Sequence, residues 1–276
     1  MQIHYKNHLD LSIFGVVSKN IESFKNKYNF MKLLVCVSQT PDTTTKIKFT
    51  NGDTEFDTNG VQFIMNPYDE WYALVRALEL KEQVGGSVTL FHVGPKANET
   101  VIRKGLAIGA DSAVRVDAEA SSALFTAKQI AEYAKAEGFD MVLLGKETID
   151  YNGSEVGAMV AELLDMPFIS YGTKMDVAGT TATINRDIEG GEETVEVEAP
   201  FVLSCAKGMA EQRIPNMRGI MMAKRKPITV IPAVEAADLA TVVKYDYPAE
   251  KTGVKLIDPE NMEELVNLLH NEAKVI

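Results

Sequence analysis

The sequence has few cysteines and histidines and no long apolar run. Its two cysteines, Cys36 and Cys205, each lie inside an apolar stretch, as buried small side chains do in a reducing compartment. The four histidines form no cluster, and no Ser-His-Asp arrangement or metal-binding spacing occurs. No apolar run approaches the length of a membrane span. We therefore expect no catalytic residues, no bound metal, no membrane span and a cytoplasmic location.

Two nucleotide-binding motifs are also absent. Neither G-x-G-x-x-G nor G-x-x-x-x-G-K-[ST] occurs, so the Rossmann fingerprint and the P-loop do not apply. The net charge of −11 argues against binding to nucleic acid or to anionic membranes. The length of 276 residues suits one large α/β domain with appendages, or two small domains.

Strand and helix patterns alternate along most of the chain. Apolar strand runs are expected at residues 32–37, 87–93, 113–116, 141–144, 201–205 and 227–231, with helices at 70–84, 98–108 and 155–164 and another from Ser121 or Ser122 to Gly138. This alternation predicts an α/β fold with a mostly parallel, doubly wound sheet. Residues 168–177, 181–188 and 194–198 alternate as an antiparallel hairpin does, so we place a hairpin at the sheet edge.

Three parts of the chain differ in composition. Residues 1–30 are rich in Asn, Lys, Ser and aromatic residues and are interpreted as a disordered, dispensable extension. Residues 31–226 form the expected α/β domain. Residues 227–276 are expected to form a C-terminal arm that includes one amphipathic helix beginning near Asp258.

The stretch from Met141 to Gly157 carries the clearest binding signal. A buried strand ends at Gly145, a polar loop follows, and Ser154 is expected to cap the helix that starts at Glu155. Asn66 is likewise expected to cap the helix at 70–84. A strand, a loop and a helix N-terminus together can bind an anion, most often part of a nucleotide. An ordinary strand-to-helix turn fits this loop equally well.

Residues 207–226 form a basic segment in an acidic chain. They hold six basic residues against Glu211, a net charge of +5, so the remainder carries −16. Methionines are interleaved with these charges, which suits an adaptable contact surface. A solvated basic face is the plainer interpretation.

Six segments resemble the β subunit of electron transfer flavoprotein, in that family's order and over roughly residues 31–250. They are Asn66 to Glu70, Gly105 to Asp111, Gly145 to Asp150, Arg186 to Thr194, Glu211 with Arg213, and Ile220 to Lys226. The resemblance implies a universal-stress-protein-like, adenine-nucleotide-binding fold. It also implies an electron carrier instead of an enzyme, joined to an α subunit that holds most of the FAD, while β binds AMP. The C-terminal arm, residues 227–276, is expected to pack on that α subunit, and residues from about 205 to 220 to form a partner-recognition loop. Electrons would pass from acyl-CoA dehydrogenases and related flavin dehydrogenases to a membrane quinone oxidoreductase or the respiratory chain, as in fatty acid β-oxidation.

The resemblance also assigns candidate residues. The nucleotide contacts it implies are Cys36, Asn66, Asp150, Asn152, Gly153, Ser154, Glu155 and Val156, and the flavin-facing residues are Thr43 and Tyr68. Met209 stands where the family anchors its dehydrogenases, so we expect it to be exposed, and Asp187 stands where an acid pairs with α. Glu155 departs from the family's usual Gln and would repel phosphate unless it faces ribose or solvent.

Two other functions remain open. A bifurcating flavoprotein would hold a second FAD in place of AMP. A universal-stress-type nucleotide-binding module would share the sheet architecture but would lack the edge hairpin and the basic methionine-rich segment.

Overall fold

A computed structural model describes residues 30–237, 239–250 and 253–276. The described chain forms two compact units: one runs up to Ile47 and continues from Thr58 to Thr241, and the other comprises Lys48–Asp57 and Val242–Ile276. The extension predicted at residues 1–30 lies, except for Phe30, outside the described residues.

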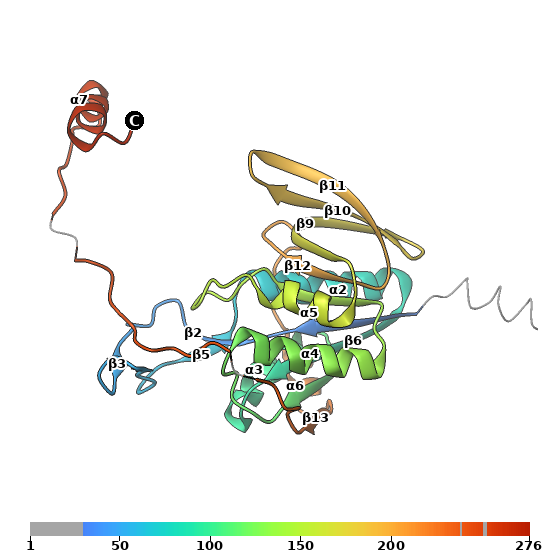
Figure 1. Ribbon diagram of the computed structural model, residues 1–276. Helices are drawn as coiled ribbons and strands as arrows, with labels where there is room; N and C mark the ends of the chain where they lie inside the picture. The colour runs from blue at the N-terminus through green and yellow to red at the C-terminus, as the bar shows by residue number, and fades with distance from the viewer. Residues whose placement is uncertain (1–29, 238, 251–252) are drawn as a thin grey trace, which may run out of the picture. The chain divides into compact units, whose positions relative to one another are not determined.

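A nine-stranded sheet forms the first unit (Figure 1). Its strands are β1 (Met31–Cys36), β6 (Gly86–Val93), β7 (Ser112–Val116), β8 (Met141–Gly145), β9 (Phe168–Ala178), β10 (Thr181–Ile188), β11 (Gly191–Glu198), β12 (Phe201–Cys205) and β13 (Ile228–Ile231). Their order is β11-β10-β9-β12-β8-β1-β6-β7-β13. Every neighbouring pair is parallel except β9–β10 and β10–β11. The predicted fold class and the antiparallel edge are confirmed. A separate short pair joins β2 (Gln39–Pro41) to β5 (Phe63–Met65).

Helices cover both faces of this sheet. They are α2 (Asp69–Val84), the 3-10 turn η1 (Lys96–Asn98), α3 (Glu99–Ile108), α4 (Ala123–Glu137), α5 (Val156–Leu164) and α6 (Met217–Ala223). Successive side chains of β1 point to opposite faces, so Leu33 packs with α2 and α3 in one core while Leu34 packs with α4 and α5 in the other. In Figure 1, α4 and α5 lie side by side over one face, which agrees with their direct packing. Both faces of the central strands are therefore apolar, as expected for a parallel sheet.

Local signals predicted some helix ends well. The Ser122 hydroxyl accepts a hydrogen bond of 3.1 Å from the Phe125 N–H and caps α4, and Gly138 ends that helix with a φ of 65°.

The sheet unit continues past the predicted start of the arm at residue 227. Strand β13 pairs in parallel with β7, from Ile228 opposite Ala113 to Ile231 opposite Val116. Beyond it, the Gln129 side chain donates to the Val234 carbonyl oxygen at 2.9 Å and accepts from the Val234 N–H at 2.7 Å. The four residues of β13 therefore belong to the sheet, and the Gln129–Val234 hydrogen bonds lie within the same unit. This unit ends at Thr241.

The second unit is small. Its strands β3 (Phe49–Thr50) and β4 (Glu55–Phe56) form a hairpin whose turn contains Asn51-Gly52, a pair typical of tight hairpin turns. The Phe49 ring stacks on Tyr245 with centroids 4.7 Å apart and also contacts Tyr247 at 5.0 Å. Helix α7 (Met262–Asn267) continues into the π-helical turn η2 (Leu268–Ala273). Aromatic stacking, instead of an apolar core, thus joins the hairpin to the arm within this unit.

Candidate functional site

The strand order creates a crevice at the carboxyl end of β1. The chain runs outward from β1 to β6 and β7 on one side and to β8 and β12 on the other. At such a switch point the connections leave β1 and β8 in opposite directions, and ligands bind in the opening. Cys36 ends β1 and Gly145 ends β8, so both border this crevice.

Asn66 holds the loop after β8 in place. Its side chain is fully buried; Nδ2 donates to the Glu147 carbonyl oxygen at 3.0 Å, and Oδ1 accepts from the Ile149 N–H at 3.1 Å. The prediction that Asn66 caps α2 is therefore wrong. The residue before α2 is Tyr68, with a φ of 66° and no side-chain cap. A buried amide needs several partners, and the loop after β8 supplies them.

Glu70, in the first turn of α2, is hydrogen-bonded to Ser38, just after the end of β1. Its carboxylate accepts from the Ser38 N–H at 2.7 Å and from the Ser38 hydroxyl at 2.5 Å. Burial raises the Glu70 pKa to about 8, against the opposing effect of these hydrogen bonds. A Cβ at Gly145 would lie 2.8 Å from the Glu70 backbone nitrogen, so only glycine permits β8 to end so close to α2.

The N-terminus of α5 has no side-chain cap. The predicted cap by Ser154 is wrong, because its hydroxyl donates to Glu147 Oε2 at 3.0 Å and its backbone has a φ of 53°. Glu155 takes the position before α5 and provides no cap either, and its side chain is exposed. Val156 therefore begins a helix whose first N–H groups are available to an anion.

The other predicted residues vary in their environment. Cys36 is a buried free thiol whose pKa burial raises far above its ordinary value. Asn152, Gly153 and Asp150 lie exposed in the loop after β8, and Asp150 accepts from the Tyr151 N–H at 3.0 Å. Tyr68 is 57% exposed. The hydrogen bonds of Asn66 and Ser154 to Glu147 thus bring Asn66 and the loop before α5 together, at the carboxyl end of β8.

Two predicted residues lie elsewhere in the chain. Thr43 is exposed in the loop after β2, and Asp187 is exposed near the end of β10. Among the described residues, no hydrogen bond links either of them to the crevice.

A cavity beside Tyr68 was not predicted. It measures about 250 Å³, and its walls include Tyr68, Asp69, Tyr72, Lys146, Glu147 and Lys207. Burial raises the Asp69 pKa to about 6, and nearby Lys146 acts against this shift. Lys146 Nζ lies 3.3 Å from Glu147 Oε1 and 5.5 Å from the centre of the Tyr171 ring. Tyr171 has a φ of 57° where β9 shifts register, and no local sequence signal marks that conformation.

The expected exposure of Met209 is wrong. Its side chain is 4% exposed and belongs to the core on the α2 side of the sheet. Its Cε would lie 3.0 Å from a Cβ at Gly172, so the missing side chain there makes room for the methionine. In this structure Met209 therefore packs inside the protein and offers no surface to a partner.

Two further expectations concern metals and membranes. Within the described residues, no group of three His, Cys, Asp or Glu side chains could hold a metal ion. The same residues include no helix that is both long and apolar enough to cross a membrane.

Comparisons with known proteins place the chain in a family. Residues 53–236 match the model of the electron transfer flavoprotein domain. The electron transfer flavoprotein subunit beta of Bacillus subtilis is 36% identical over 261 residues, covering 89% of this chain and 100% of the relative. The subunit beta of Bradyrhizobium diazoefficiens is 34% identical, with 89% and 100% covered, and that of Bos taurus is 32% identical, with 89% and 99% covered. With the doubly wound sheet and its antiparallel edge, these matches show that the chain belongs to the electron transfer flavoprotein family, among its beta subunits.

Proposed function

We propose that the chain joins an α subunit to form an electron transfer flavoprotein and binds AMP in the crevice at the end of β1. The uncapped N-terminus of α5, beside the buried Asn66, is the observation that carries the AMP assignment. Free N–H groups and the positive end of a helix dipole favour a phosphate there.

The chain's residues would divide the nucleotide between them. The backbone N–H groups at Val156 would meet the phosphate, and the strand end at Cys36 would border the adenosine. Glu155 is exposed, so its carboxylate can remain in solvent, away from the phosphate. The repulsion between the Glu155 carboxylate and the phosphate, which the sequence alone leads one to expect, is then avoided.

The second cofactor of the proposed heterodimer is FAD, held mainly by α. The flavin would supply the electron-transfer chemistry, so this chain would need no general acid, base or nucleophile. Its part is a surface that shields the flavin, in which the exposed Tyr68 and Thr43 would face the α subunit. Asp187 would pair with a basic residue of α. Electrons would come from acyl-CoA dehydrogenases and similar flavin dehydrogenases and pass to a quinone oxidoreductase, with the carrier in the bacterial cytoplasm.

One experiment tests these assignments together. The chain is co-purified with its α subunit, the complex is denatured, and the released nucleotides are quantified by chromatography. We expect close to equimolar FAD and AMP per heterodimer, and no tightly bound FAD on the chain purified alone. Two FAD and no AMP would establish the bifurcating alternative, and a complex without any adenine nucleotide would refute the crevice assignment.

A further inference from the structure

His92, near the carboxyl end of β6, is a buried histidine to which the proposed function gives no role. Its Nδ1 lies 2.8 Å from the Val37 carbonyl oxygen, and its Nε2 lies 3.0 Å from the side-chain nitrogen of Asn98. Burial lowers the pKa of His92, so the ring is neutral at pH 7. Because a carbonyl oxygen can only accept, Nδ1 carries the proton and Nε2 accepts from Asn98.

The bond from His92 to Val37 takes the place of a sheet hydrogen bond. The Val37 N–H donates to the Phe91 carbonyl oxygen at 2.9 Å, and in a parallel ladder the Val37 carbonyl oxygen would next accept from the Val93 N–H. The register of β1 with β6 nevertheless ends at Cys36 and Phe91. In the part of the chain that the structure describes, no hydrogen bond joins Val93 to Val37, whose carbonyl oxygen is held by the imidazole.

The backbone of Val93 therefore faces the carboxyl end of β1 without a sheet partner there. The N–H and C=O of one strand residue point to the same neighbouring strand. The Gly94 N–H donates to the Val116 carbonyl oxygen of β7 at 3.1 Å, so Val93, one residue earlier, points to the β1 side. Within the described residues, neither backbone group of Val93 makes a hydrogen bond on that side. Buried backbone groups are nearly always paired, so a donor and an acceptor left together at a buried residue indicate a ligand.

The turn after Val93 is held by two buried side chains. Arg115 of β7 donates to the Gly94 carbonyl oxygen at 2.8 Å. A Cβ at Gly94 would lie 2.4 Å from both His92 Nε2 and Asn98 Nδ2, so only glycine leaves room for the hydrogen bond between them. These contacts fix the backbone around Val93 before any ligand arrives.

The groups that Val93 presents match one edge of adenine. On that edge adenine has an acceptor, N1, beside a donor, the N6 amino group, whereas hypoxanthine has the donor N1–H beside the acceptor O6. Strands β6 and β8 lie on either side of β1, so their ends are roughly 10 Å apart at a spacing of about 4.8 Å per strand. A single nucleotide spans this separation, with its phosphate at the N-terminus of α5 and its base at Val93.

We propose that His92 is a positioning residue for the nucleotide: by occupying the Val37 carbonyl oxygen, it keeps the N–H and C=O of Val93 free for the adenine ring. The inference rests on the proposed AMP site and names what selects the base there. Without His92, the Val93 N–H would pair with the Val37 carbonyl oxygen, and the ladder between β1 and β6 would extend by one bond. The site would then lose its donor while the sheet remains intact.

The test compares three His92 variants in the heterodimer with α, using equilibrium dialysis against labelled AMP. His92→Leu removes both ring contacts, and AMP affinity should fall about tenfold or more. His92→Asn keeps a donor at the position of Nδ1 and should restore most of that affinity. His92→Gln places its amide near Asn98 instead, so it should bind AMP as weakly as His92→Leu. Urea unfolding of each variant separates these effects from changes in stability.

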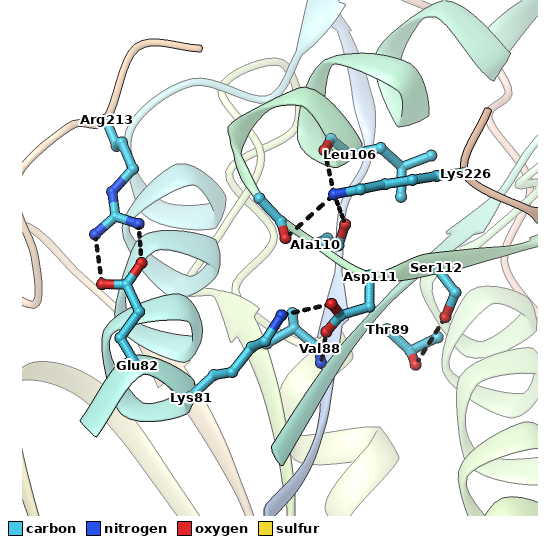
Figure 2. Close-up of polar contacts among 11 residues, drawn as sticks. Lys81, Glu82, Val88, Thr89, Leu106, Ala110, Asp111, Ser112, Arg213 and Lys226 are labelled. Atoms are coloured by element: carbon cyan, nitrogen blue, oxygen red, sulfur yellow. Dashed lines mark hydrogen bonds and ion pairs between the residues drawn. The ribbon is translucent and has the colours of Figure 1, made fainter. Parts of the chain in front are cut away.

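The opposite end of the same strand pair supplies a matched control, shown in Figure 2. There the hydroxyls of Thr89 in β6 and Ser112 in β7 lie 3.3 Å apart, and the Asp111 carboxylate accepts from the Val88 N–H at 2.9 Å. Thr89→Val removes one of these contacts and keeps the shape of the side chain. It should lower the stability of the strand pair and leave AMP affinity unchanged.

Base selectivity tests the role of Val93 directly. The wild type should bind inosine monophosphate about 100-fold more weakly than AMP, because N1–H and O6 would face the N–H and C=O of Val93, and His92→Leu should reduce this ratio. Equal affinity of the wild type for the two nucleotides would overturn the inference.

The variants give two further outcomes that would overturn it. One is AMP affinity in His92→Leu equal to that of Thr89→Val, and the other is His92→Asn binding no better than His92→Gln, which would leave His92 a purely structural role. In each case the wild type still binds AMP, so the proposed nucleotide site stands. A wild-type complex that neither contains nor binds AMP would refute that site and this inference with it.

Discussion

Asn66 and Glu147 lie 81 residues apart in the chain, yet the Asn66 amide donates to the Glu147 carbonyl oxygen at 3.0 Å. The same amide accepts from the Ile149 N–H, so one side chain fixes the start of the loop after β8. Glu147 in turn holds Ser154 at the other end of that loop. The hydrogen bonds of Asn66 and Glu147 thus fix the conformation of the loop that precedes α5.

Replacing Asn66 by Ala should open this loop. The change leaves a buried N–H and a carbonyl oxygen unpaired, which should lower the free energy of unfolding by about 1–3 kcal/mol. AMP content after co-purification with α should fall well below that of the wild type. Ser122→Ala, which removes the cap of α4 and should cost about 1 kcal/mol, is the control for simple destabilisation. Equal AMP content in the two variants would show that Asn66 does not shape the nucleotide site.

Glu70 should make stability depend on pH. Its pKa is about 8 in the folded chain against an ordinary value of 4.5, so the folded state keeps a proton that the unfolded state loses. The stability that protonated Glu70 contributes to the folded state is fully present below its unfolded pKa of 4.5. It is lost as the pH rises towards 8. The pKa of Asp69 is raised from 3.8 to about 6, so Asp69 also lowers the stability as pH rises, but over a lower pH range. Urea unfolding should therefore show less loss of stability between about pH 6 and 8 in Glu70→Gln than in the wild type.

Asp69→Asn is the matched control for this pH dependence. Above pH 6 its free energy of unfolding should fall with pH as steeply as that of the wild type, and only below pH 6 should the slope differ. The reason is that Asp69 titrates below about pH 6. Parallel curves for Glu70→Gln and the wild type would mean that Glu70 is ionised throughout.

The two glycines at the ends of the loop should differ in tolerance. Gly145→Ala brings a Cβ within 2.8 Å of the Glu70 backbone nitrogen, and the strand end must move away from α2. We expect a loss of about 1–3 kcal/mol in stability and reduced AMP content. At Gly153 the nearest atom to a Cβ is Glu155 Oε1 at 3.3 Å, on an exposed side chain that can turn away. Gly153→Ala should therefore bind AMP normally, whereas Gly153→Val should disturb the loop more; normal AMP content in Gly145→Ala would contradict this account.

How much the sequence predicts depends on how far apart the interacting residues lie. The central strands and the helices on their two faces follow from local runs of apolar residues, and the hairpin at the edge follows from alternation. The capping prediction for Asn66 failed because its partners, Glu147 and Ile149, lie 81 and 83 residues away along the chain. The capping prediction for Ser154 failed for a local reason, since its hydroxyl donates to Glu147 in the same loop and its backbone has a positive φ. Met209 was wrongly expected at the surface because its buried position also depends on a distant residue. The space that it fills exists because Gly172, on strand β9, has no side chain. Positive φ at Tyr68 and Tyr171 has no sequence signature at all.

Met209→Ala should behave as a core substitution. Removing this buried side chain leaves a cavity near Gly172 and should cost about 2–5 kcal/mol of stability. Electron acceptance, measured at a temperature where the variant is folded, should fall equally with a protein donor and with dithionite, or not at all. A selective loss with the protein donor alone would show that Met209 leaves the core to contact the partner.

The second unit should serve the contact with α. Many of its apolar side chains are exposed in the single chain, namely Val242, Val243, Tyr247, Val254, Leu256, Met262 and Val266. In the part of this stretch that the structure describes, α7 and the turn η2 bury too few of these apolar residues to form a core of their own. A chain that ends at Thr241 retains the entire nine-stranded sheet and the Gln129–Val234 bridge, so it should fold. Its affinity for α should fall by at least about 100-fold, since the loss of several apolar contacts at once costs more than 2.7 kcal/mol.

A second truncation locates the part that matters. A chain ending at Pro259 loses α7 and η2 but keeps Tyr245 and Tyr247 against Phe49, so the hairpin retains its aromatic partners. If α covers the whole arm, affinity measured by calorimetry should fall in two steps, first with α7 and then with the aromatic stretch. Circular dichroism should be used in parallel to verify that both truncated chains keep the folded sheet. A chain ending at Thr241 that binds α as tightly as the full-length chain would show that the exposed apolar residues of the arm serve some other contact.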